Sequence, residues 1–297
     1  MTILEAKKIL RHFYSLSNPT EEEEFLYTEA LQFLIAETKD SDYMVDLGGF
    51  YYDKREFDLA LKYYEMAAEY GNRYAISNLG YIWYYGRTGE KDYEKAFKYF
   101  DKARAMGDIV AAYKVADMYR NGYYVEKDYD KYREIILSLY PKVKNARRLG
   151  EPLPEIFTRL AKICSEEGKT EEALSLYDTA RDFLAQRIRA NPFFGNLTIM
   201  KWLIHDMYEL REFDPASMDL YDLYHVLRSP AKVSFFFEQD RHEAEAVEEN
   251  GALVIRFDDT WFRTIDDFFL KAEMDGEFVT TRYEELYDFE VEGAENA

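Results

Sequence analysis

The sequence contains one cysteine, four histidines and no long run of apolar residues, and each shortage excludes a class of protein. A single cysteine cannot form an internal disulfide, which excludes a disulfide-stabilised secreted domain. Without an apolar run of about 18 residues, a membrane-spanning helix is not expected. Residues 1–10 mix charged side chains among the apolar ones, unlike a secretion signal. We therefore expect a cytoplasmic protein that does not act at a membrane.

Signatures of catalysis are equally scarce. No two histidines lie at a metal-binding spacing, and Ala246 stands where a zinc-protease motif beginning at His242 needs its second histidine. Cys164 follows Leu160 by one turn on an apolar helix face, which indicates a buried thiol and not a nucleophile. Acidic pairs such as 266–267 are typical of solvated faces or helix caps. We expect no enzyme, no metal and no cofactor, with chemistry in the C-terminal part kept as a minor alternative.

The charge is acidic and unevenly distributed. The chain carries −20 overall, and the residues from 238 to the end hold 19 acidic and 5 basic side chains, or −14. An acidic surface repels nucleic acid, and no basic stripe offsets it, so a nucleic-acid partner is not expected. The same surface attracts basic proteins with a salt-dependent association rate. The alternative explanation is that the acidity only keeps the chain in solution.

An internal repeat with an offset of 36 residues is the most informative pattern. It pairs Leu79 with Val115, Gly80 with Ala116, Trp83 with Tyr119 and Gly86 with Gly122. The same offset pairs Ala60 with Ala96, Tyr64 with Phe100, Ala67 with Ala103 and Gly71 with Gly107. A fixed period in this range indicates a solenoid of stacked helical hairpins, which presents surface more often than it houses chemistry.

Residues 75–108 are the clearest unit. The first helix is predicted to end near Gly86, because glycine adopts the left-handed conformation that stops a helix. Asp92 is placed to cap the second helix, and Gly107 ends it. Small residues at 80, 96 and 103 stand beside large aromatic ones at 83 and 100. This alternation is what close packing between hairpins requires.

These residues resemble the Sel-1-like repeat, a relative of the tetratricopeptide repeat. The matching positions are Ala75, Leu79-Gly80, Trp83, Gly86, Asp92, Lys95-Ala96, Tyr99, Lys102-Ala103 and Gly107. The next unit keeps Ala111, Val115-Ala116, Tyr119, Gly122, Val125 and Asp128, but its second helix departs from the pattern before Pro141. Two shorter units resemble the tetratricopeptide form, with Leu47-Gly48, Ala60, Tyr64 and Ala67 in one and Leu160-Ala161, Ala173, Tyr177 and Ala180 in the other. The resemblance covers residues 41–187, with a break expected at prolines 152 and 154.

The resemblance implies a mainly α fold, a right-handed solenoid of helical hairpins, and the residues that follow the solenoid are expected to add a small C-terminal α+β module. We expect residues 1–228 to form the solenoid, closed by helices at 2–14 and 20–38 and by a pair at 197–210 and 218–227. Thr20 with Glu23 is a capping-box signature at the start of the second helix.

The period changes near residue 228, and residues 229–297 are predicted to form the acidic α+β module. Strands are expected at 232–237, 252–257 and 287–291, because these segments are short and rich in β-branched and aromatic residues. Helices are expected at 264–272 and 281–286. The acidic segment 238–250 is expected to be an exposed loop or helix, with a turn at Asn250-Gly251.

The resemblance also implies a binding groove, because the first helix of each hairpin lines the inner surface in such repeats. Tyrosine and arginine favour interfaces, since they bury a large area and keep a polar tip. The residues carried over as partner-binding are Tyr52, Tyr74, Ser77, Tyr81, Tyr84, Tyr85, Tyr113, Asp117, Arg120, Asn121 and Lys162, with Asp42 and Thr158 beside them. The alternative is that tyrosine, with 27 copies, is simply common here and packs between hairpins.

Two functions compete on this sequence. The first is a non-catalytic scaffold or adaptor that binds a peptide or protein partner in the concave groove. The second is an acidic inhibitor or immunity protein that neutralises a basic toxin or nuclease through the C-terminal module. The charge asymmetry favours a basic partner, whereas the repeats favour a partner bound in the groove.

Overall fold

The computed structural model describes residues 1–16, 18–192, 194–214 and 216–292. The chain divides into two compact units, Met1–Ile136 and Leu137–Ala297. The division falls within the helix formed by residues 129–143. The domain boundary expected near residue 228 lies inside the second unit, where the last helices and the sheet contact one another.

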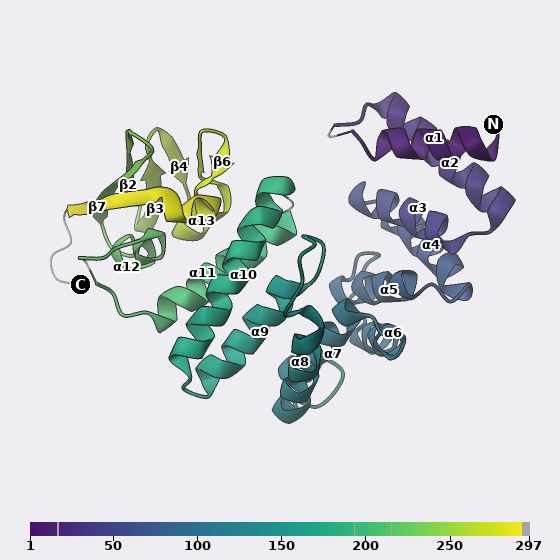
Figure 1. The fold of residues 1–297 in the computed structure, drawn as a ribbon, viewed down its shortest axis with the longest axis horizontal. Coiled ribbons are helices and arrows are strands. Elements are labelled where there is room, and N and C mark those ends of the chain that lie inside the picture. Colours follow the sequence, from purple (N-terminus) through teal and green to yellow (C-terminus); the bar gives the residue numbers. More distant parts are fainter. Residues whose placement is uncertain (17, 193, 215, 293–297) are drawn as a thin grey trace. The chain divides into compact units, whose positions relative to one another are not determined.

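The first unit is a series of antiparallel helical hairpins (Figure 1). Its helices are α1 (Ile3–Phe13), α2 (Glu21–Thr38), α3 (Ser41–Asp53), α4 (Phe57–Glu69), α5 (Arg73–Tyr85), α6 (Tyr93–Ala105), α7 (Ile109–Asn121) and the start of α8 (Tyr129–Val143). Contacts join α1 to α2, α3 to α4 and α5 to α6 within hairpins, and α2 to α3, α4 to α5 and α6 to α7 between them. This is the stacked-hairpin architecture that the repeat predicts.

Local signals in the sequence set the helix ends. Asp92 caps α6 by accepting a hydrogen bond from the backbone N–H of Lys95 at 2.9 Å. Gly86 follows α5 with φ of 64°, which a residue with a side chain rarely adopts. At the N-terminus Thr20 and Glu23 form the predicted capping box, in which each side chain bonds the other residue's backbone N–H. Thr2 and Glu5 form a second capping box, which was not predicted.

The repeat core is built from the small and aromatic positions of the sequence pattern. Ala96, Phe100 and Ala103 are buried on the inner face of α6. The Phe100 ring fills the space beside Gly80 in α5, where a Cβ atom would lie 2.6 Å from ring carbons. The predicted alternation of small and large side chains is therefore confirmed at this hairpin.

The second unit begins with further helices. They are the end of α8, α9 (Leu153–Glu166), α10 (Thr170–Ala190), α11 (Phe194–Leu210), the 3₁₀ turn η1 (Leu220–Asp222) and the short α12 (Leu223–Val226). The break predicted at prolines 152 and 154 is confirmed, because α8 ends at Val143 and α9 begins at Leu153, directly after Pro152. Pro154 lies within the first turn of α9, and Pro141 lies within the last turn of α8. The helix predicted at 218–227 is shorter than expected, because a capping box between Asp219 and Asp222 starts it as a 3₁₀ turn.

A five-stranded antiparallel sheet follows in the order β4-β3-β2-β1-β7 (Figure 1). Its strands are β1 (Ala231–Phe237), β2 (Asp240–Glu249), β3 (Ala252–Phe257), β4 (Thr260–Phe262) and β7 (Leu286–Glu292). A two-stranded sheet joins β5 (Glu273–Met274) to β6 (Glu277–Phe278). The helix α13 (Ile265–Lys271) contacts β3, β4 and α11, and α12 contacts β1, so the module packs on the last helices of its unit.

The prediction for segment 238–250 was wrong, because it contains the central strand β2. Ala244 and Ala246 are buried on one face of the sheet, whereas Glu243 and Glu245, which alternate with them, lie on the other. Glu243 pairs with Lys232 at 2.7 Å, and Glu245 pairs with Arg256 at 2.6 Å, both from neighbouring strands. These cross-strand pairs explain how so acidic a segment forms a strand. Asn250-Gly251 forms the predicted turn between β2 and β3.

Two other parts of the module differ from expectation. The helix predicted at 281–286 is replaced by two 3₁₀ turns, η2 (Val279–Thr281) and η3 (Tyr283–Glu285). The strand β4 was not predicted, because three residues give no readable alternation.

In the part of the chain that the structure describes, no helix combines the length and apolar character of a membrane span.

Candidate partner-binding surface

Tyrosine rings from the first helices of three successive hairpins gather on one surface of the first unit. We call the set the tyrosine surface: Tyr52 from α3, Tyr81, Tyr84 and Tyr85 from α5, and Tyr113 from α7. The hydroxyl groups of Tyr81 and Tyr113 lie 3.3 Å apart, and the rings of Tyr81 and Tyr85 stack at 6.1 Å. A cavity of about 190 Å³ opens between Tyr52, Tyr64, Asn78 and Tyr81.

Lys114 places its ammonium group among these rings. Its Nζ atom lies 5.1, 5.4, 5.7 and 5.6 Å from the ring centroids of Tyr81, Tyr84, Tyr85 and Tyr113. A cation over an aromatic face is stabilised by about 0.5–1 kcal/mol where water is near. The four rings therefore hold a positive charge at the centre of the surface.

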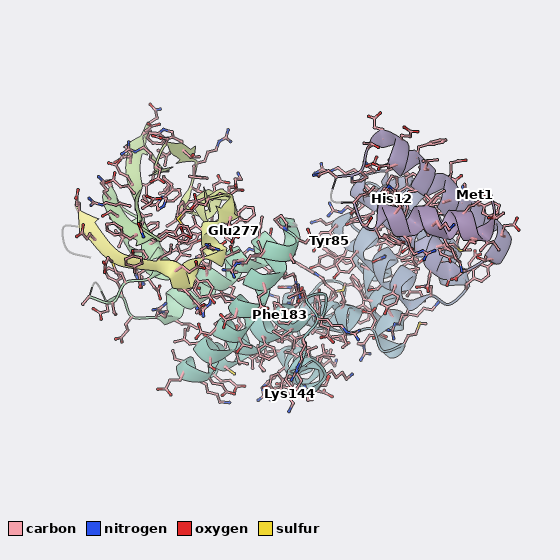
Figure 2. The ribbon with its side chains drawn as sticks, turned by 45° about the horizontal axis from the view of Figure 1, so that its top comes forward. Met1, His12, Tyr85, Lys144, Phe183 and Glu277 are labelled. Atoms are coloured by element: carbon pink, nitrogen blue, oxygen red, sulfur yellow. The ribbon has the colours of Figure 1, made fainter. Side chains whose placement is uncertain are left out.

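Arg87 supplies a second cation at the edge of the tyrosine surface. Its Nε atom donates a hydrogen bond of 2.9 Å to the Tyr52 hydroxyl, and its guanidinium carbon lies 4.9 Å from the Tyr85 ring centroid. Among the described residues no carboxylate pairs with Arg87. The exposed ring of Tyr85 ends α5 beside it (Figure 2). The surface thus offers a guanidinium fixed by aromatic rings and not neutralised by an acid.

Packing differs among the members of the surface. Tyr84 makes edge contacts with Tyr93, Phe100 and Tyr123, and burial together with the nearby Asp117 carboxylate raises the pKa of its hydroxyl. Its hydroxyl is therefore protonated at neutral pH and can donate a hydrogen bond. Tyr85 is 42% exposed, whereas Tyr113 is 7% exposed. Tyr85 is accordingly the ring most accessible to a partner.

The remaining predicted residues of the first unit lie in several environments. Ser77 is buried in α5 at 3% exposure, and the exposed Tyr74 accepts a hydrogen bond from Arg73 at 2.9 Å. Arg120 donates to the Tyr132 hydroxyl at 3.0 Å, while the Asn121 amide donates to the Asp117 carbonyl at 2.8 Å near the end of α7. Asp42 accepts a hydrogen bond from Asn72, which caps α5.

Lys162 belongs to the second unit, on α9. Its ammonium group lies 3.2 Å from a carboxylate oxygen of Asp206 on α11, and the Tyr177 hydroxyl donates to the other oxygen at 3.2 Å. Thr158, one turn earlier on the same helix, donates back to the Pro154 carbonyl at 2.8 Å. The structure therefore gives Lys162 an ion pair that ties α9 to α11.

Sequence reasoning missed Asn78, Arg87 and Lys114. Asn78 and Lys114 each precede a repeat anchor, Leu79 or Val115, and they are 36 residues apart. The repeat could have revealed both residues, because each lies one residue before a recurring packing position of the repeat, and position 78 lies three residues before Tyr81 on the same helix face. Arg87 follows the glycine that ends α5, and the repeat pattern carries no signal for it.

One group of potential metal ligands lies elsewhere, on α11. His205, Asp206 and Glu209 bring ligand atoms within 4.8 Å of one another. Asp206 is already paired with Lys162, whose ammonium group would repel a bound cation. Cys164 is buried, and burial raises the pKa of its thiol, as expected for a core residue and not for a nucleophile.

Comparisons with known proteins match the hairpins described above. The Sel1 repeat model matches residues 42–72, 73–108 and 109–131. The Sel1 repeat protein of Oxalobacter formigenes is 21% identical, with 67% of this chain and 77% of that chain covered and a TM-score of 0.47. The c5321 protein of uropathogenic Escherichia coli is 18% identical, with coverage of 71% and 50% and a TM-score of 0.41. Yeast Tom70 is 16% identical, with coverage of 70% and 48% and a TM-score of 0.37.

A search of curated proteins found no match. The three matched segments coincide with the hairpins α3–α4 and α5–α6 and with α7. The repeats that resemble the Sel-1-like pattern in the sequence are thus recognised by the family model, and residues 42–131 of the chain are three consecutive Sel1 repeats.

Proposed function

We propose that the protein is an interaction scaffold and that the tyrosine surface is the wall on which its partner binds. Sel1 and tetratricopeptide-like repeats generally mediate contacts between proteins and are typically non-catalytic. The observation that carries the proposal is the convergence of five tyrosines and two cations, Arg87 and Lys114, from three successive hairpins. Aromatic rings and arginine supply most of the energy at protein interfaces.

The chemistry of the surface favours a peptide segment that carries a carboxylate. Arg87 is held over the Tyr52 and Tyr85 rings and has no acidic partner in the described ranges of the chain, so a carboxylate could bind it in the bidentate geometry that arginine prefers. The cavity beside Tyr81 and Asn78 could receive a neighbouring side chain, and the Asn78 amide offers hydrogen bonds to a peptide backbone. The preferred partner is therefore an acidic segment with an apolar or aromatic neighbour.

A peptide selection tests this function directly. The whole chain is immobilised, random peptides displayed on phage are selected at low salt, and the affinities of the enriched peptides are measured by fluorescence polarisation. We expect enrichment of Asp or Glu next to an apolar residue. Arg87→Gln and Tyr85→Ala should each weaken binding by about tenfold, since both side chains are exposed and can change without disturbing the core.

Matched controls lie on the same unit. Tyr70→Ala removes an exposed tyrosine at the end of α4, and Lys91→Gln removes an exposed cation before α6. Both should bind the selected peptides like the wild type, and all four variants should keep the helical circular dichroism. Selected peptides that bind Arg87→Gln and Tyr85→Ala with wild-type affinity would contradict the proposal.

A second candidate function is that of an acidic inhibitor or immunity protein, and one observation favours it. Four carboxylates, Glu238, Asp240, Asp258 and Asp259, lie at the turns β1–β2 and β3–β4 at one end of the sheet. We call them the acidic rim. Asp240 and Asp259 have no basic partner among the residues that the structure describes. Such a rim would attract a basic protein, in keeping with the cytoplasmic role and basic partner expected from the sequence.

A further inference from the structure

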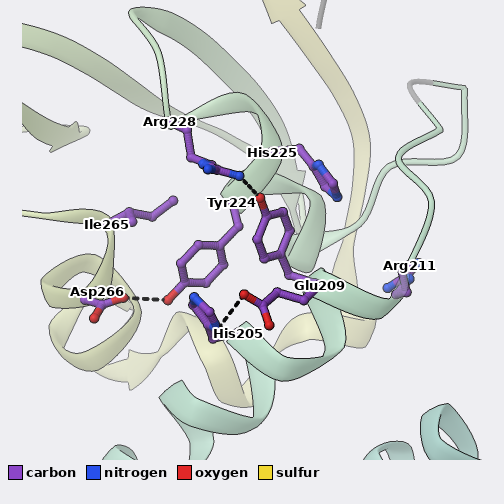
Figure 3. Close-up of a pocket in the computed structure, with 9 residues that line it drawn as sticks. His205, Glu209, Arg211, Tyr224, His225, Arg228, Ile265 and Asp266 are labelled. Carbon is purple, nitrogen blue, oxygen red and sulfur yellow. Dashed lines mark hydrogen bonds and ion pairs between the residues drawn. The ribbon is translucent and has the colours of Figure 1, made fainter. Parts of the chain in front are cut away.

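A cavity of about 730 Å³ opens in the second unit between α11, α12 and α13 (Figure 3). Its lining combines aromatic, basic and acidic side chains: His205, Tyr208, Glu209, Arg211, Tyr224, His225, Arg228, Ile265 and Asp266. We propose that this cavity binds a small anionic ligand through a carboxylate or phosphate group, with Arg228 and the Tyr208 hydroxyl as its hydrogen-bonding partners and the His225 imidazole in the same lining.

The polar groups of the cavity are fixed by a continuous stack of rings. Tyr224 stacks on Phe269 at 4.5 Å and on Tyr208 at 5.4 Å. The His225 ring contacts the Tyr208 ring edge-on, with 4.3 Å between ring centroids. The His225 ring also stacks on the Phe213 ring, with 5.0 Å between centroids. Because every ring is held by its neighbours, the hydroxyl and imidazole groups keep their positions before a ligand arrives. Such preorganisation lowers the entropic cost of binding.

Two groups, Arg228 and the Tyr208 hydroxyl, leave hydrogen-bonding capacity at the cavity, and a third lining residue, His225, has a buried nitrogen without a partner among the residues that the structure describes. Arg228 donates one N–H to the Tyr208 hydroxyl, as the dashed line in Figure 3 marks, and no carboxylate pairs with it in the described part of the chain. The Tyr208 hydroxyl, which accepts from Arg228, still has its own hydrogen to donate. The His225 Nε2 atom is buried and has no hydrogen-bond partner.

The acidic residues of the lining are already engaged or directed to solvent. Asp266 lies 2.9 Å from the Lys201 ammonium group and accepts a hydrogen bond of 2.9 Å from the Tyr224 hydroxyl. Glu209 is a largely exposed side chain whose carboxylate lies 3.9 Å from His205. Arg211 pairs with Asp219 at 2.6 Å, outside the lining. In the lining that the structure describes, Arg228 carries a positive charge without a carboxylate partner, and the negative charge of Glu209 lies on a largely exposed side chain. An anion held by Arg228 and the Tyr208 hydroxyl is therefore the ligand that the buried part of the lining favours.

The electrostatic state of His225 gives an independent readout. Burial, together with the positive charges of Arg228 and Arg211, lowers the pKa of His225 below its usual value. A bound anion adds a negative charge beside the same imidazole and should raise that pKa again. The shift should be absent at His12 on α1 and at His242 on β2, which lie outside the cavity.

The chain has only four histidines, so side-chain NMR of the full-length protein labelled with ¹⁵N-histidine resolves the test. Sodium phosphate and sodium acetate are titrated separately at about pH 7, with sodium chloride keeping the ionic strength constant. We expect the imidazole chemical shifts of His225 and His205 to change until the site is saturated, and those of His12 and His242 to stay constant. A response to phosphate alone assigns the ligand to phosphate esters, and a response to acetate alone assigns it to carboxylates; either outcome supports the site.

Two charge-matched variants complete the test. Arg228→Gln should lower the affinity for the anion by about tenfold or more, because it removes a charge-assisted hydrogen bond. Arg263→Gln removes an exposed arginine of the same module that does not line the cavity and should change nothing. Unaltered His12 and His242 signals show that each variant is folded. The proposal is overturned if neither anion gives a saturable shift of His225, if all four histidines respond alike, or if both variants bind alike.

Discussion

The ring of Tyr64 in α4 lies directly against the Cα atom of Gly48 in α3. A Cβ atom at residue 48 would be 2.7 Å from two carbons of that ring, closer than real side-chain contacts allow. Gly49, the next residue on the same helix, has room for a methyl group, because its Cβ would meet only the Tyr64 hydroxyl at 3.8 Å. The same relationship recurs one hairpin later between Gly80 and Phe100.

Gly48→Ala should therefore destabilise the first unit, whereas Gly49→Ala should not. Overpacking of this kind typically costs about 1–3 kcal/mol in the free energy of unfolding. Alanine in place of Gly49 gains helix propensity of up to about 1 kcal/mol. Urea unfolding followed by circular dichroism compares the two variants, and amide hydrogen exchange in α3 and α4 locates the change. Equal effects of the two substitutions would show that the Gly48–Tyr64 contact does not hold the hairpin.

The repeat was readable from sequence because each position requires a side chain of one size and character, such as small or aromatic. Gly80, Ala96 and Ala103 must be small where helices approach, and Gly86 must take a left-handed conformation. Such constraints recur at a fixed interval, so they can be recognised without knowing the fold. The same reasoning predicted the caps of α2 and α6, which depend only on residues three apart.

The strand β2 could not be read in this way, because its evidence lies on other strands. Glu243 and Glu245 look like a solvated acidic segment until Lys232 on β1 and Arg256 on β3 are placed opposite them. Arg87 at the tyrosine surface was missed for a related reason: it follows the glycine that ends α5, and its contact with Tyr52 joins two hairpins. Whether the predicted groove residues bind a partner stays a prediction.

Lys114 should be required for its charge and not only for its bulk. Lys114→Glu would place a carboxylate against four tyrosine rings, whose negative faces repel it, and would repel an acidic peptide. We expect the affinity for the peptides selected on the wild type to fall by more than about tenfold, and Lys114→Arg to stay within about threefold. Fluorescence polarisation measures both, with circular dichroism as the check on folding. Wild-type affinity in Lys114→Glu would remove this cation from the binding surface.

His225 should make the second unit sensitive to acid. Burial and the charges of Arg228 and Arg211 lower the pKa of His225 in the folded state below the ordinary value of 6.5. Between the folded pKa and 6.5 the unfolded chain binds more protons than the folded one, so stability rises with pH there and is lost as the pH falls. The loss begins below about pH 6.5 and is complete below the folded pKa.

His225→Gln should flatten this pH dependence, while His12→Gln, which changes an exposed histidine of the first unit, should not. Urea unfolding of the full chain at pH 7.5 and pH 5.5, compared among the three proteins, measures the difference. If the wild type and His225→Gln lose the same stability between the two pH values, another group titrates in this range and His225 is not responsible.

The acidic rim should bind basic proteins at low salt, and high salt should abolish that binding. Its carboxylates lie at exposed turns of the sheet, and exposed charges interact over roughly 10 Å at 0.1 M salt and over only about 3 Å at 1 M. A pull-down with the whole chain should retain basic proteins at low salt and release them at high salt. Asp240→Asn combined with Asp258→Asn and Asp259→Asn should prevent that retention.

The matched control makes the same change in charge on the first unit, with Glu22→Gln, Glu29→Gln and Glu37→Gln on the exposed face of α2. It should retain the basic proteins, because it leaves the rim intact. A partner captured equally by the rim variant, or held at high salt, would instead bind through another surface. Since Arg87→Gln and Tyr85→Ala leave the rim unchanged, loss of that partner in those variants would assign it to the tyrosine surface.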